Sequence, residues 1–261
     1  MVTDYGKEER RNSVSKKLTD SRIGVVKYNR YGSRMQVIQY NNAKDITVKF
    51  ENGFTKKAAW NEFCKGTIKS VYDRTVHKVG YLGEGIYTYN THRAAYNTWS
   101  SMLNRCYGKT GHKAYKDCTV ATEWHNFQNF CEWFEDNYYE VNEERTALDK
   151  DILYKGNRVY SSDTCVFVPK TINSLFIRNR STGSNLPIGV YFDKKKSMYR
   201  AKCNAEGTEK FIGRYSNLNE AFNAYKYFKE SYIKRIAEEY KKDIPEKLYY
   251  ALLSYEVDIN D

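Results

Sequence analysis

One stretch near the C-terminus constrains the fold most, because an alternating pattern with a period of two gives way there to a helical one. Residues 188–193, 198–204 and 210–215 alternate like short strands and are separated by turn residues. A long helix is expected to begin after Asn217, with Glu220 three residues later as its capping-box partner. The pattern predicts a three-stranded sheet with one helix on one face.

The predicted middle strand has two chemically different faces, since successive side chains on a strand point to opposite sides. Three small or apolar side chains should face the helix, and three polar ones should line the open face. The helix-facing set is Tyr199, Ala201 and Cys203, and the open set is Arg200, Lys202 and Asn204. The open face is therefore expected to be basic.

The composition is that of a globular chain. Aromatic residues make up 16% of the 261 residues, tyrosine alone supplies 25, and proline only 3. So many aromatic side chains can form a core, which excludes collagen-like and disordered classes. No apolar run approaches the ~18 residues of a membrane span, and the start has no apolar secretion segment. We expect an α+β chain of three small units in the cytoplasm.

The rest of the chain suggests four further features. Residues 1–20 are expected to be a frayed arm or a short helix. Alternation and turn glycines predict an antiparallel meander over 23–53, followed by a short helix within 54–65. Helices are expected over 92–107 and 122–137, with aromatic stripes whose spacing suits a core. A strand at 165–168 and a short helix at 170–177 follow, and Gly80, Gly83 and Gly85 mark turns rather than a phosphate loop.

The charge is uneven. Of the net +11, residues 1–90 carry +8, residues 91–185 carry +1, residues 186–244 carry +5 and the tail from Pro245 carries −3. Basic flanks attract polyanions such as nucleic acid, although a solvated basic surface explains the same numbers. We expect a basic β-rich unit at 1–90, a second unit at 91–180, a polar linker at 178–185, a sheet–helix unit at 186–244 and an acidic tail at 245–261.

The six cysteines form no C-x-x-C pair, so reduced and buried thiols are expected. Five residues in the middle of the chain alternate between cysteine and histidine: Cys106, His112, Cys118, His125 and Cys131. Their spacings do not match the short knuckles that hold structural zinc. No metal site is predicted from them.

The C-terminal unit resembles the DNA-binding domain of plant ethylene-response factors and of recombinase arm-binding domains. The matching features are Gly189-Val190-Tyr191, Tyr199-Arg200-Ala201, Ile212-Gly213 before an aromatic residue, and the helix with Asn217, Glu220-Ala221 and Ala224-Tyr225. In that family the open sheet face lies in the major groove of DNA. The resemblance implies DNA contacts by Lys194, Lys196, Arg200, Lys202 and Arg214. The third strand carries Phe211 where the family has tryptophan, so a base contact there does not carry over.

The middle of the chain resembles phage-encoded proteins in which an HNH-like ββα-metal segment precedes such a domain. The matching motifs are Trp99-x-x-Met102-x-x-Arg105-Cys106-Tyr107, Glu123-Trp124-x-x-Phe127, Leu148-Asp149-Lys150-Asp151-Ile152, and Tyr160-Ser161 with Cys165-x-Phe167-Val168-Pro169 and Asn173. The resemblance implies a free-standing homing endonuclease or a decayed relative, with residues 91–180 as a degenerate HNH-like unit.

The HNH pattern is incomplete in one respect that matters for catalysis. HNH chemistry needs a histidine base beside a metal ion, and all four histidines lie outside residues 148–177. Asp149, Asp151 and Asn173 are the remaining catalytic candidates, with Asn157 as a further polar one. Mg²⁺ would be needed only for a nuclease, held by one aspartate and phosphate oxygens. Alternatively, Asp149 pairs with Lys150 or Arg158 and this unit is only a scaffold.

Three functions remain open at this stage. The first is a phage DNA-binding protein of homing-endonuclease descent with weak or lost cleavage, which binds double-stranded DNA in the cytoplasm of an infected bacterium. The second is an anti-defence protein that binds and inhibits a host immune nuclease, using exposed tyrosine and arginine side chains as interface anchors. The third is an active Mg²⁺-dependent DNA endonuclease. The sequence assigns no oligomeric state.

Overall fold

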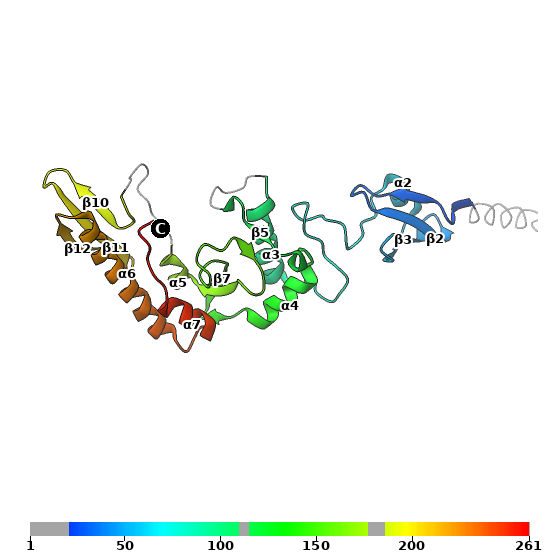
Figure 1. The fold of residues 1–261 in the computed structure, drawn as a ribbon. Helices are drawn as coiled ribbons and strands as arrows, with labels where there is room; N and C mark the ends of the chain where they lie inside the picture. The colour runs from blue at the N-terminus through cyan, green and yellow to red at the C-terminus, as the bar shows by residue number, and fades with distance from the viewer. Residues whose placement is uncertain (1–20, 110–114, 177–185, 261) are drawn as a thin grey trace, which may run out of the picture. The chain divides into compact units, whose positions relative to one another are not determined.

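The structure, a computed structural model, describes residues 21–109, 115–176 and 186–260, and the chain forms two compact units, residues 1–133 and 134–261. The fold is α+β, with several antiparallel sheets and a C-terminal sheet–helix unit (Figure 1). The expected arm at 1–20, the linker from Arg178 and His112 lie outside the described residues. The boundary at Trp133 does not coincide with any of the expected unit boundaries.

The N-terminal unit begins with the predicted meander. Its strands are β1 (Val26–Tyr28), β2 (Arg34–Asn42), β3 (Asp45–Phe50) and β4 (Thr55–Ala58), which pair antiparallel in chain order. Alternate residues of β2 and β3 are fully buried against α2 (Trp60–Lys65), in a core made by Met35, Val37, Ile46, Val48 and Phe63. The helix expected within 54–65 begins only at Trp60, because the first half of that stretch extends the sheet.

Helices and a short strand follow in the chain: α3 (Arg93–Tyr107), β5 (Thr119–Val120), the 3-10 helix η2 (Thr122–His125) and α4 (Phe127–Asn137). The aromatic stripes form a core, as predicted, since Trp99, Trp124, Phe127 and Phe130 are buried. The indole of Trp99 donates a hydrogen bond of 2.7 Å to the Trp124 carbonyl. Of the three glycines before α3, Gly80 closes a turn by donating to the Val76 carbonyl at 2.8 Å, Gly83 has a positive φ and Gly85 lies in a bend.

The C-terminal unit opens with a strand–strand–helix segment. Strands β6 (Glu140–Val141), β7 (Glu144–Asp149) and β9 (Val166–Pro169) form an antiparallel sheet, with β8 (Val159–Tyr160) in the connection between β7 and β9. The short helix α5 (Lys170–Ser174) follows β9 directly, after the Pro169 cap. This ββα arrangement agrees with the fold expected for the middle of the chain.

The sheet–helix unit has the predicted elements: β10 (Val190–Asp193), β11 (Met198–Ala205), β12 (Thr208–Tyr215) and α6 (Leu218–Tyr240), which lies along one face of the sheet (Figure 1). Asn217 caps α6 by accepting a hydrogen bond from the Asn219 amide, but no return bond from Glu220 closes a capping box. Gly189 has a positive φ, and a Cβ there would stand 2.1 Å from the Tyr225 ring, so the backbone approaches α6 closely only because the residue is glycine.

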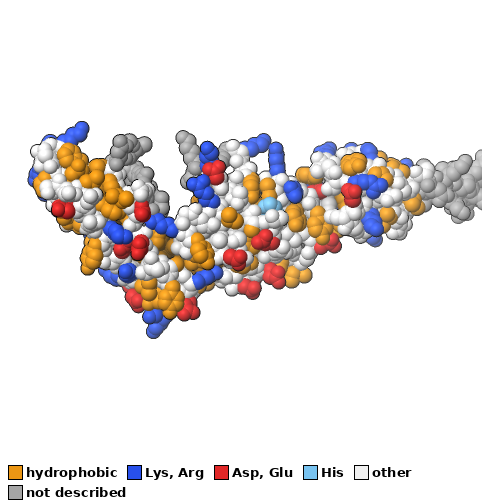
Figure 2. All heavy atoms as spheres, viewed as in Figure 1, with side chains coloured by type: hydrophobic (Ala, Val, Ile, Leu, Met, Phe, Trp, Pro, Cys, Tyr) orange, Lys and Arg blue, Asp and Glu red, His pale blue; other side chains and the backbone are white. Residues whose placement is uncertain are grey.

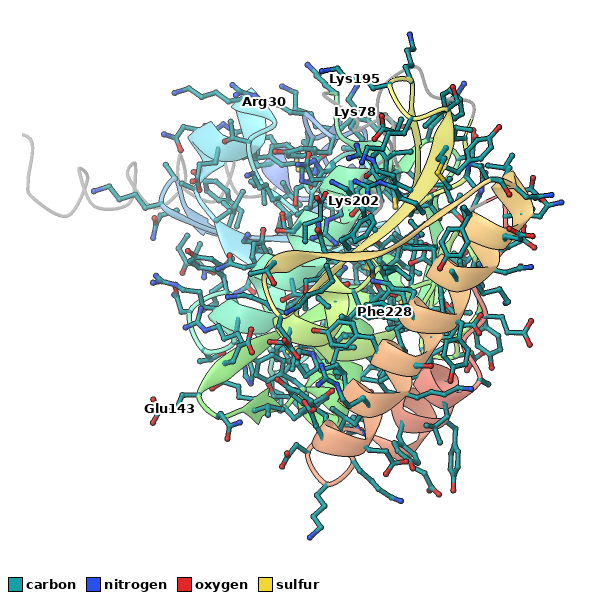
Figure 3. All side chains as sticks on the ribbon, turned by 90° about the vertical axis from the view of Figure 1, so that its left-hand side faces the viewer. Arg30, Lys78, Glu143, Lys195, Lys202 and Phe228 are labelled. Carbon is teal, nitrogen blue, oxygen red and sulfur yellow. The ribbon has the colours of Figure 1, made fainter. Side chains whose placement is uncertain are left out.

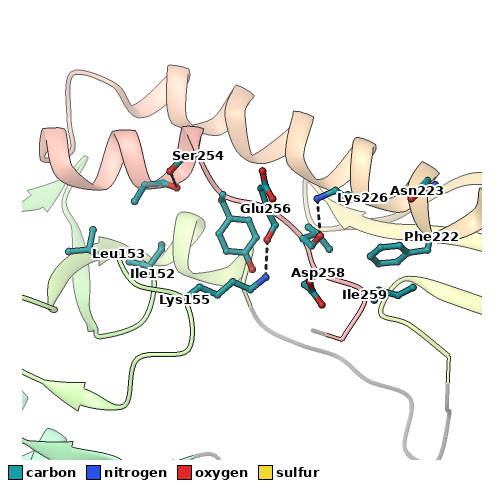
Figure 4. Close-up of a pocket in the computed structure, with 13 residues that line it drawn as sticks. Ile152, Leu153, Lys155, Phe222, Asn223, Lys226, Ser254, Glu256, Asp258 and Ile259 are labelled. Atoms are coloured by element: carbon teal, nitrogen blue, oxygen red, sulfur yellow. Dashed lines mark hydrogen bonds between the residues drawn. The ribbon is translucent and has the colours of Figure 1, made fainter. Parts of the chain in front are cut away.

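The acidic tail expected from Pro245 is instead part of the fold. Helix α7 (Glu246–Leu253) packs Leu248, Tyr249 and Leu252 against α6 and the ββα segment. The segment after it lines a cavity of about 660 Å³ shown in Figure 4. There the Lys155 ammonium donates to the Glu256 carbonyl and the Lys226 ammonium donates to the Val257 carbonyl. These side chains secure the end of the chain against the sheet–helix unit.

A search for membrane spans among the described helices found none that is both long and apolar enough.

Candidate nucleic-acid interface

The candidate site is the face of the β10–β11–β12 sheet that points away from α6. We call it the open face. Ala201 and Cys203 of β11 are buried against α6, while Arg200 and Lys202, which alternate with them, point to the other side, as predicted. Burial raises the pKa of the Cys203 thiol, so a neutral thiol packs behind the sheet. The helix therefore fixes which side chains the open face presents.

The strand register arranges the open face in cross-strand rows. Tyr191 of β10 lies opposite Arg200 of β11, and Arg200 lies opposite Arg214 of β12. A bulge between Ala201 and Lys202 shifts the register by one residue, which places Lys202 opposite Phe211. The bulge thus brings an exposed aromatic ring and a cation onto the same face as the Arg200 row.

Aromatic and cationic side chains of these rows contact each other. The Lys202 ammonium stands 5.8 Å from the centre of the Tyr191 ring, and the Arg214 guanidinium stands 5.2 Å from the centre of the Phe211 ring. Phe211 is 54% exposed, so its contact with Arg214 leaves most of the ring accessible. Each pair combines a charge that attracts phosphate with a flat apolar surface.

Two carboxylates lie on the open face as well. Asp193 stands 3.8 Å from the Nε atom of Arg200, and Glu209 accepts a hydrogen bond from the Lys202 ammonium. At 3.8 Å the first pair is too long for a hydrogen bond, and within the described part of the chain the buried Nε of Arg200 has no hydrogen-bond partner. This Nε atom is thus buried beside the Asp193 carboxylate, while the Arg200 side chain as a whole is 33% exposed.

The turn between β10 and β11 carries three consecutive lysines. Lys194, Lys195 and Lys196 are all exposed, and the Asp193 carboxylate shapes the turn by accepting from the amides of Lys195 and Lys196 at 3.1 and 3.3 Å. Figure 3 labels Lys195 on this turn and Lys202 on β11. Together, the open face and its turn present six cations against two carboxylates.

The catalytic candidates of the ββα segment have structural roles. Strand β7 ends at Asp149, whose carboxylate accepts from the amides of Asp151 and Ile152 at 2.9 and 2.8 Å. Burial raises the pKa of Asp149, and the neighbouring Asp151 adds to the effect. The cation beside these groups, Lys150, pairs with Asp151 at 3.1 Å rather than with Asp149. The Lys150 charge nevertheless acts on Asp149 and lowers its pKa against the other two effects, and the alternative pair between Asp149 and Arg158 stays a prediction.

The two asparagines do not complete a catalytic cluster. Asn157 donates to the backbone oxygens of Lys150 and Val159, both at 2.7 Å, and so closes the loop between β7 and β8. Asn173 is partly buried on α5. Among the described residues, neither Asp149 nor Asp151 belongs to a set of three His, Cys, Asp or Glu side chains close enough to share a metal ion. The ββα arrangement is therefore present without such a ligand set among the described residues.

Two residues of the interface escaped the sequence analysis. Lys195 stands between the two lysines assigned to DNA, and Tyr191 shares the open face with Arg200. The period of two in β10 contained the signal for Tyr191, because it alternates with the buried Val190.

Comparisons of the chain with protein-family models, with curated proteins and with solved structures found no significant match.

Proposed function

We propose that the protein binds double-stranded DNA through the open face, with Arg200, Lys202 and Arg214 as the central contacts and Lys194 and Lys196 at the turn. The observation that carries the proposal is the pairing of cations with exposed rings on a sheet face that α6 leaves uncovered. As part of the same proposal, the chain descends from phage-encoded homing endonucleases, acts in the cytoplasm of an infected bacterium, and has weak or lost cleavage activity.

The dimensions of the sheet support a groove-binding mode. Neighbouring strands lie about 4.8 Å apart, so the backbones of three strands span about 10 Å. The major groove of DNA is about 12 Å wide and accepts strands whose arginine and lysine side chains reach guanine edges or phosphates. The Arg200 side chain is 33% exposed, so part of it is accessible to a phosphate or a guanine edge.

The ion pairs on the open face do not oppose DNA binding strongly. Ion pairs between solvent-accessible side chains contribute about 0–1 kcal/mol each, whereas a phosphate contact also releases condensed counterions. We expect phosphates to replace Asp193 and Glu209 as partners of Arg200 and Lys202. The carboxylates then hold the two cations in position until DNA arrives.

The structural role of the Asp149 carboxylate supports weak or lost cleavage. Its carboxylate is already engaged by two backbone amides, and its raised pKa makes it a poorer anionic metal ligand. No histidine lies within residues 148–177 to act as a base.

The test is fluorescence anisotropy with a labelled mixed-sequence duplex over graded salt. Arg200→Ala/Lys202→Ala should weaken binding at low salt by about tenfold or more, and should lower the slope of log affinity against log salt by about 1 per lost phosphate contact. The matched control is Lys234→Ala/Lys242→Ala, which removes the same charge from exposed positions on and after α6. Equal losses in both variants, or no binding by the wild type at low salt, would overturn the proposal.

A further inference from the structure

A second cationic and aromatic surface lies on the N-terminal unit, around the loop that joins β1 to β2. We call it the hairpin-loop surface, and it consists of Lys27, Tyr28, Arg30, Tyr31, Arg34 and Lys69. Tyr28 lies opposite Arg34 in the strand register, and the Lys69 ammonium stands 5.6 Å from the centre of the Tyr31 ring. Lys27 donates to the Cys64 carbonyl, and the Arg30 amide donates to the Gly66 carbonyl at 2.9 Å.

A buried polar network holds this loop in place. Asn29 accepts from the amides of Tyr31 and Ser33, and its own amide group donates to Asp73 and to the Ile68 carbonyl. Asp73 also accepts from the Ser33 hydroxyl and the Ser70 amide. Asn29 and Asp73 are 6% and 3% exposed, so the network is shielded from water and fixes the positions of the loop residues around it.

Residues 21–69, which contain the hairpin-loop surface, carry a strong excess of positive charge. Residues 21–69 contain 10 lysines and arginines against 3 aspartates and glutamates. No cation of the hairpin-loop surface forms an ion pair with a carboxylate in the part of the chain that the structure describes. In Figure 2, basic side chains border apolar ones over the β1–β4 region, and Figure 3 labels Arg30 there. The surface therefore suits a polyanion.

The two exposed tyrosines, Tyr28 and Tyr31, favour one class of polyanion, namely a nucleic acid with unpaired bases. Tyr28 is 65% exposed and Tyr31 is 47% exposed, although both are large apolar rings beside the buried Asn29. Exposed rings among cations are typical of surfaces on which unpaired bases stack, at about 1–3 kcal/mol per base. A duplex hides its base faces and offers only phosphates and base edges, so it would leave both ring faces unused.

We propose that the hairpin-loop surface binds single-stranded nucleic acid, with Tyr28 and Tyr31 stacking on bases and Arg30, Arg34 and Lys69 contacting phosphates. This surface lies on a different unit from the open face and does not depend on it. The protein would then hold duplex DNA through one unit and an unpaired strand through the other.

The test uses the full chain carrying Arg200→Ala/Lys202→Ala, so that the open face contributes little. Anisotropy is measured with a labelled 12-nucleotide oligothymidine and with a 12-base-pair duplex. Tyr28→Ser/Tyr31→Ser should weaken oligothymidine binding by about tenfold or more, while Tyr28→Phe/Tyr31→Phe should retain it, because phenylalanine keeps the stacking surface. Tyr227→Ser, at a 77% exposed position on α6, is the control and should bind as the parent does.

Three results would overturn the inference: no binding of oligothymidine at low salt, equal binding of duplex and single strand, or equal affinity of the serine and phenylalanine variants. A thermal melt of each variant verifies that the N-terminal unit is folded. If the serine variant is unfolded, Arg30→Ala/Lys69→Ala replaces it, and its oligothymidine affinity must fall below that of Lys44→Ala/Lys57→Ala, which removes two exposed cations elsewhere on the same sheet.

Discussion

The open face and the hairpin-loop surface place cations beside exposed aromatic rings in different electrostatic surroundings. On the open face, Arg200 and Lys202 each have a carboxylate neighbour. On the hairpin-loop surface, the one acid in the supporting network, Asp73, is buried and occupied by hydrogen bonds. Paired cations are held in one geometry, whereas unpaired cations create a stronger positive potential. Net charge alone therefore does not describe the electrostatic surroundings of the cations on a basic surface.

The largest expected effect is a loss of stability in the C-terminal unit that leaves the stability of the N-terminal unit unchanged. Gly189→Ala should destabilise the C-terminal unit by about 2–4 kcal/mol, because it adds a positive-φ penalty to overpacking against the Tyr225 ring. All four tryptophans lie in the N-terminal unit, so urea unfolding followed by tryptophan fluorescence should be unchanged while circular dichroism shows the loss.

The matched control for this variant is Gly207→Ala in the turn between β11 and β12. Gly207 also has a positive φ, but a Cβ there meets no atom within 4 Å, so only the backbone penalty of about 1 kcal/mol remains. Equal losses in the two variants would mean that the close approach to Tyr225 is not what requires glycine.

The second effect comes from removing Asp73, which belongs to the buried network that supports the hairpin-loop surface. Asp73→Ala should cost about 2–4 kcal/mol, since it leaves the donors of Asn29, Ser33 and Ser70 buried without an acceptor. Tryptophan fluorescence during urea unfolding measures the loss. Asp45→Ala, which removes an exposed hydrogen bond in the same unit, should change stability by less than about 0.5 kcal/mol. A stable Asp73→Ala protein with normal oligothymidine binding would argue against a prearranged loop.

The third effect makes the open face more like the hairpin-loop surface. Glu209→Gln removes the carboxylate beside Lys202 and should raise duplex affinity about twofold to fivefold at low salt, with a smaller gain at high salt. Anisotropy measures both. Glu239→Gln on α6 removes the same charge beside Arg235 and is expected to change affinity less. A fall in affinity with Glu209→Gln would mean that the ion pair is needed to orient Lys202.

The smallest effect concerns Asp149, whose carboxylate organises a loop in the C-terminal unit as that of Asp73 does in the N-terminal unit. The pKa of Asp149 is raised by burial, so its protonation is easier in the folded state and its contribution favours folding below the unfolded pKa. That contribution is lost as the pH rises through the folded pKa. Asp149→Asn keeps an oxygen for the two amides and removes the charge.

On acidification from pH 7 to pH 4, the wild type should therefore gain unfolding free energy relative to Asp149→Asn, as measured by urea unfolding at each pH. DNA binding should be unchanged in this variant, since its loop is preserved. A fall in the unfolding free energy of the wild type relative to Asp149→Asn on acidification would contradict the assignment of burial as the cause.

Local patterns in the sequence were sufficient to predict the sheets that hold both surfaces. Alternating apolar residues in β2, β3 and β11, together with turn glycines, fixed their faces, because the side-chain period of a strand is a local property. The neighbours of Lys202 could not be predicted from the sequence. They depend on the bulge after Ala201 and on Glu209, which lies diagonally across from Lys202 on the neighbouring strand. Those contacts arise only once the strands pair.

Features that depend on tertiary packing were missed or wrong. The segment from Pro245 carries four acidic residues and suggested a tail, yet Leu248 and Leu252 are spaced for one helix face and are fully buried. The Asn29–Asp73 network joins residues 44 positions apart, and no local pattern marks it. For Asp149, the sequence indicated a carboxylate in the right segment but not the backbone amides that occupy it.

The most direct test of the central claim is photochemical crosslinking of the wild-type protein to a duplex carrying 5-iododeoxyuridine, followed by mass spectrometry of the attached peptides. The claim is that the open face contacts double-stranded DNA, and Tyr191 and Phe211 are the aromatic side chains there that are suited to crosslink. Attachment within residues 190–215 is the expected result. Attachment confined to other regions, including the Tyr28 and Tyr31 loop, would contradict the claim.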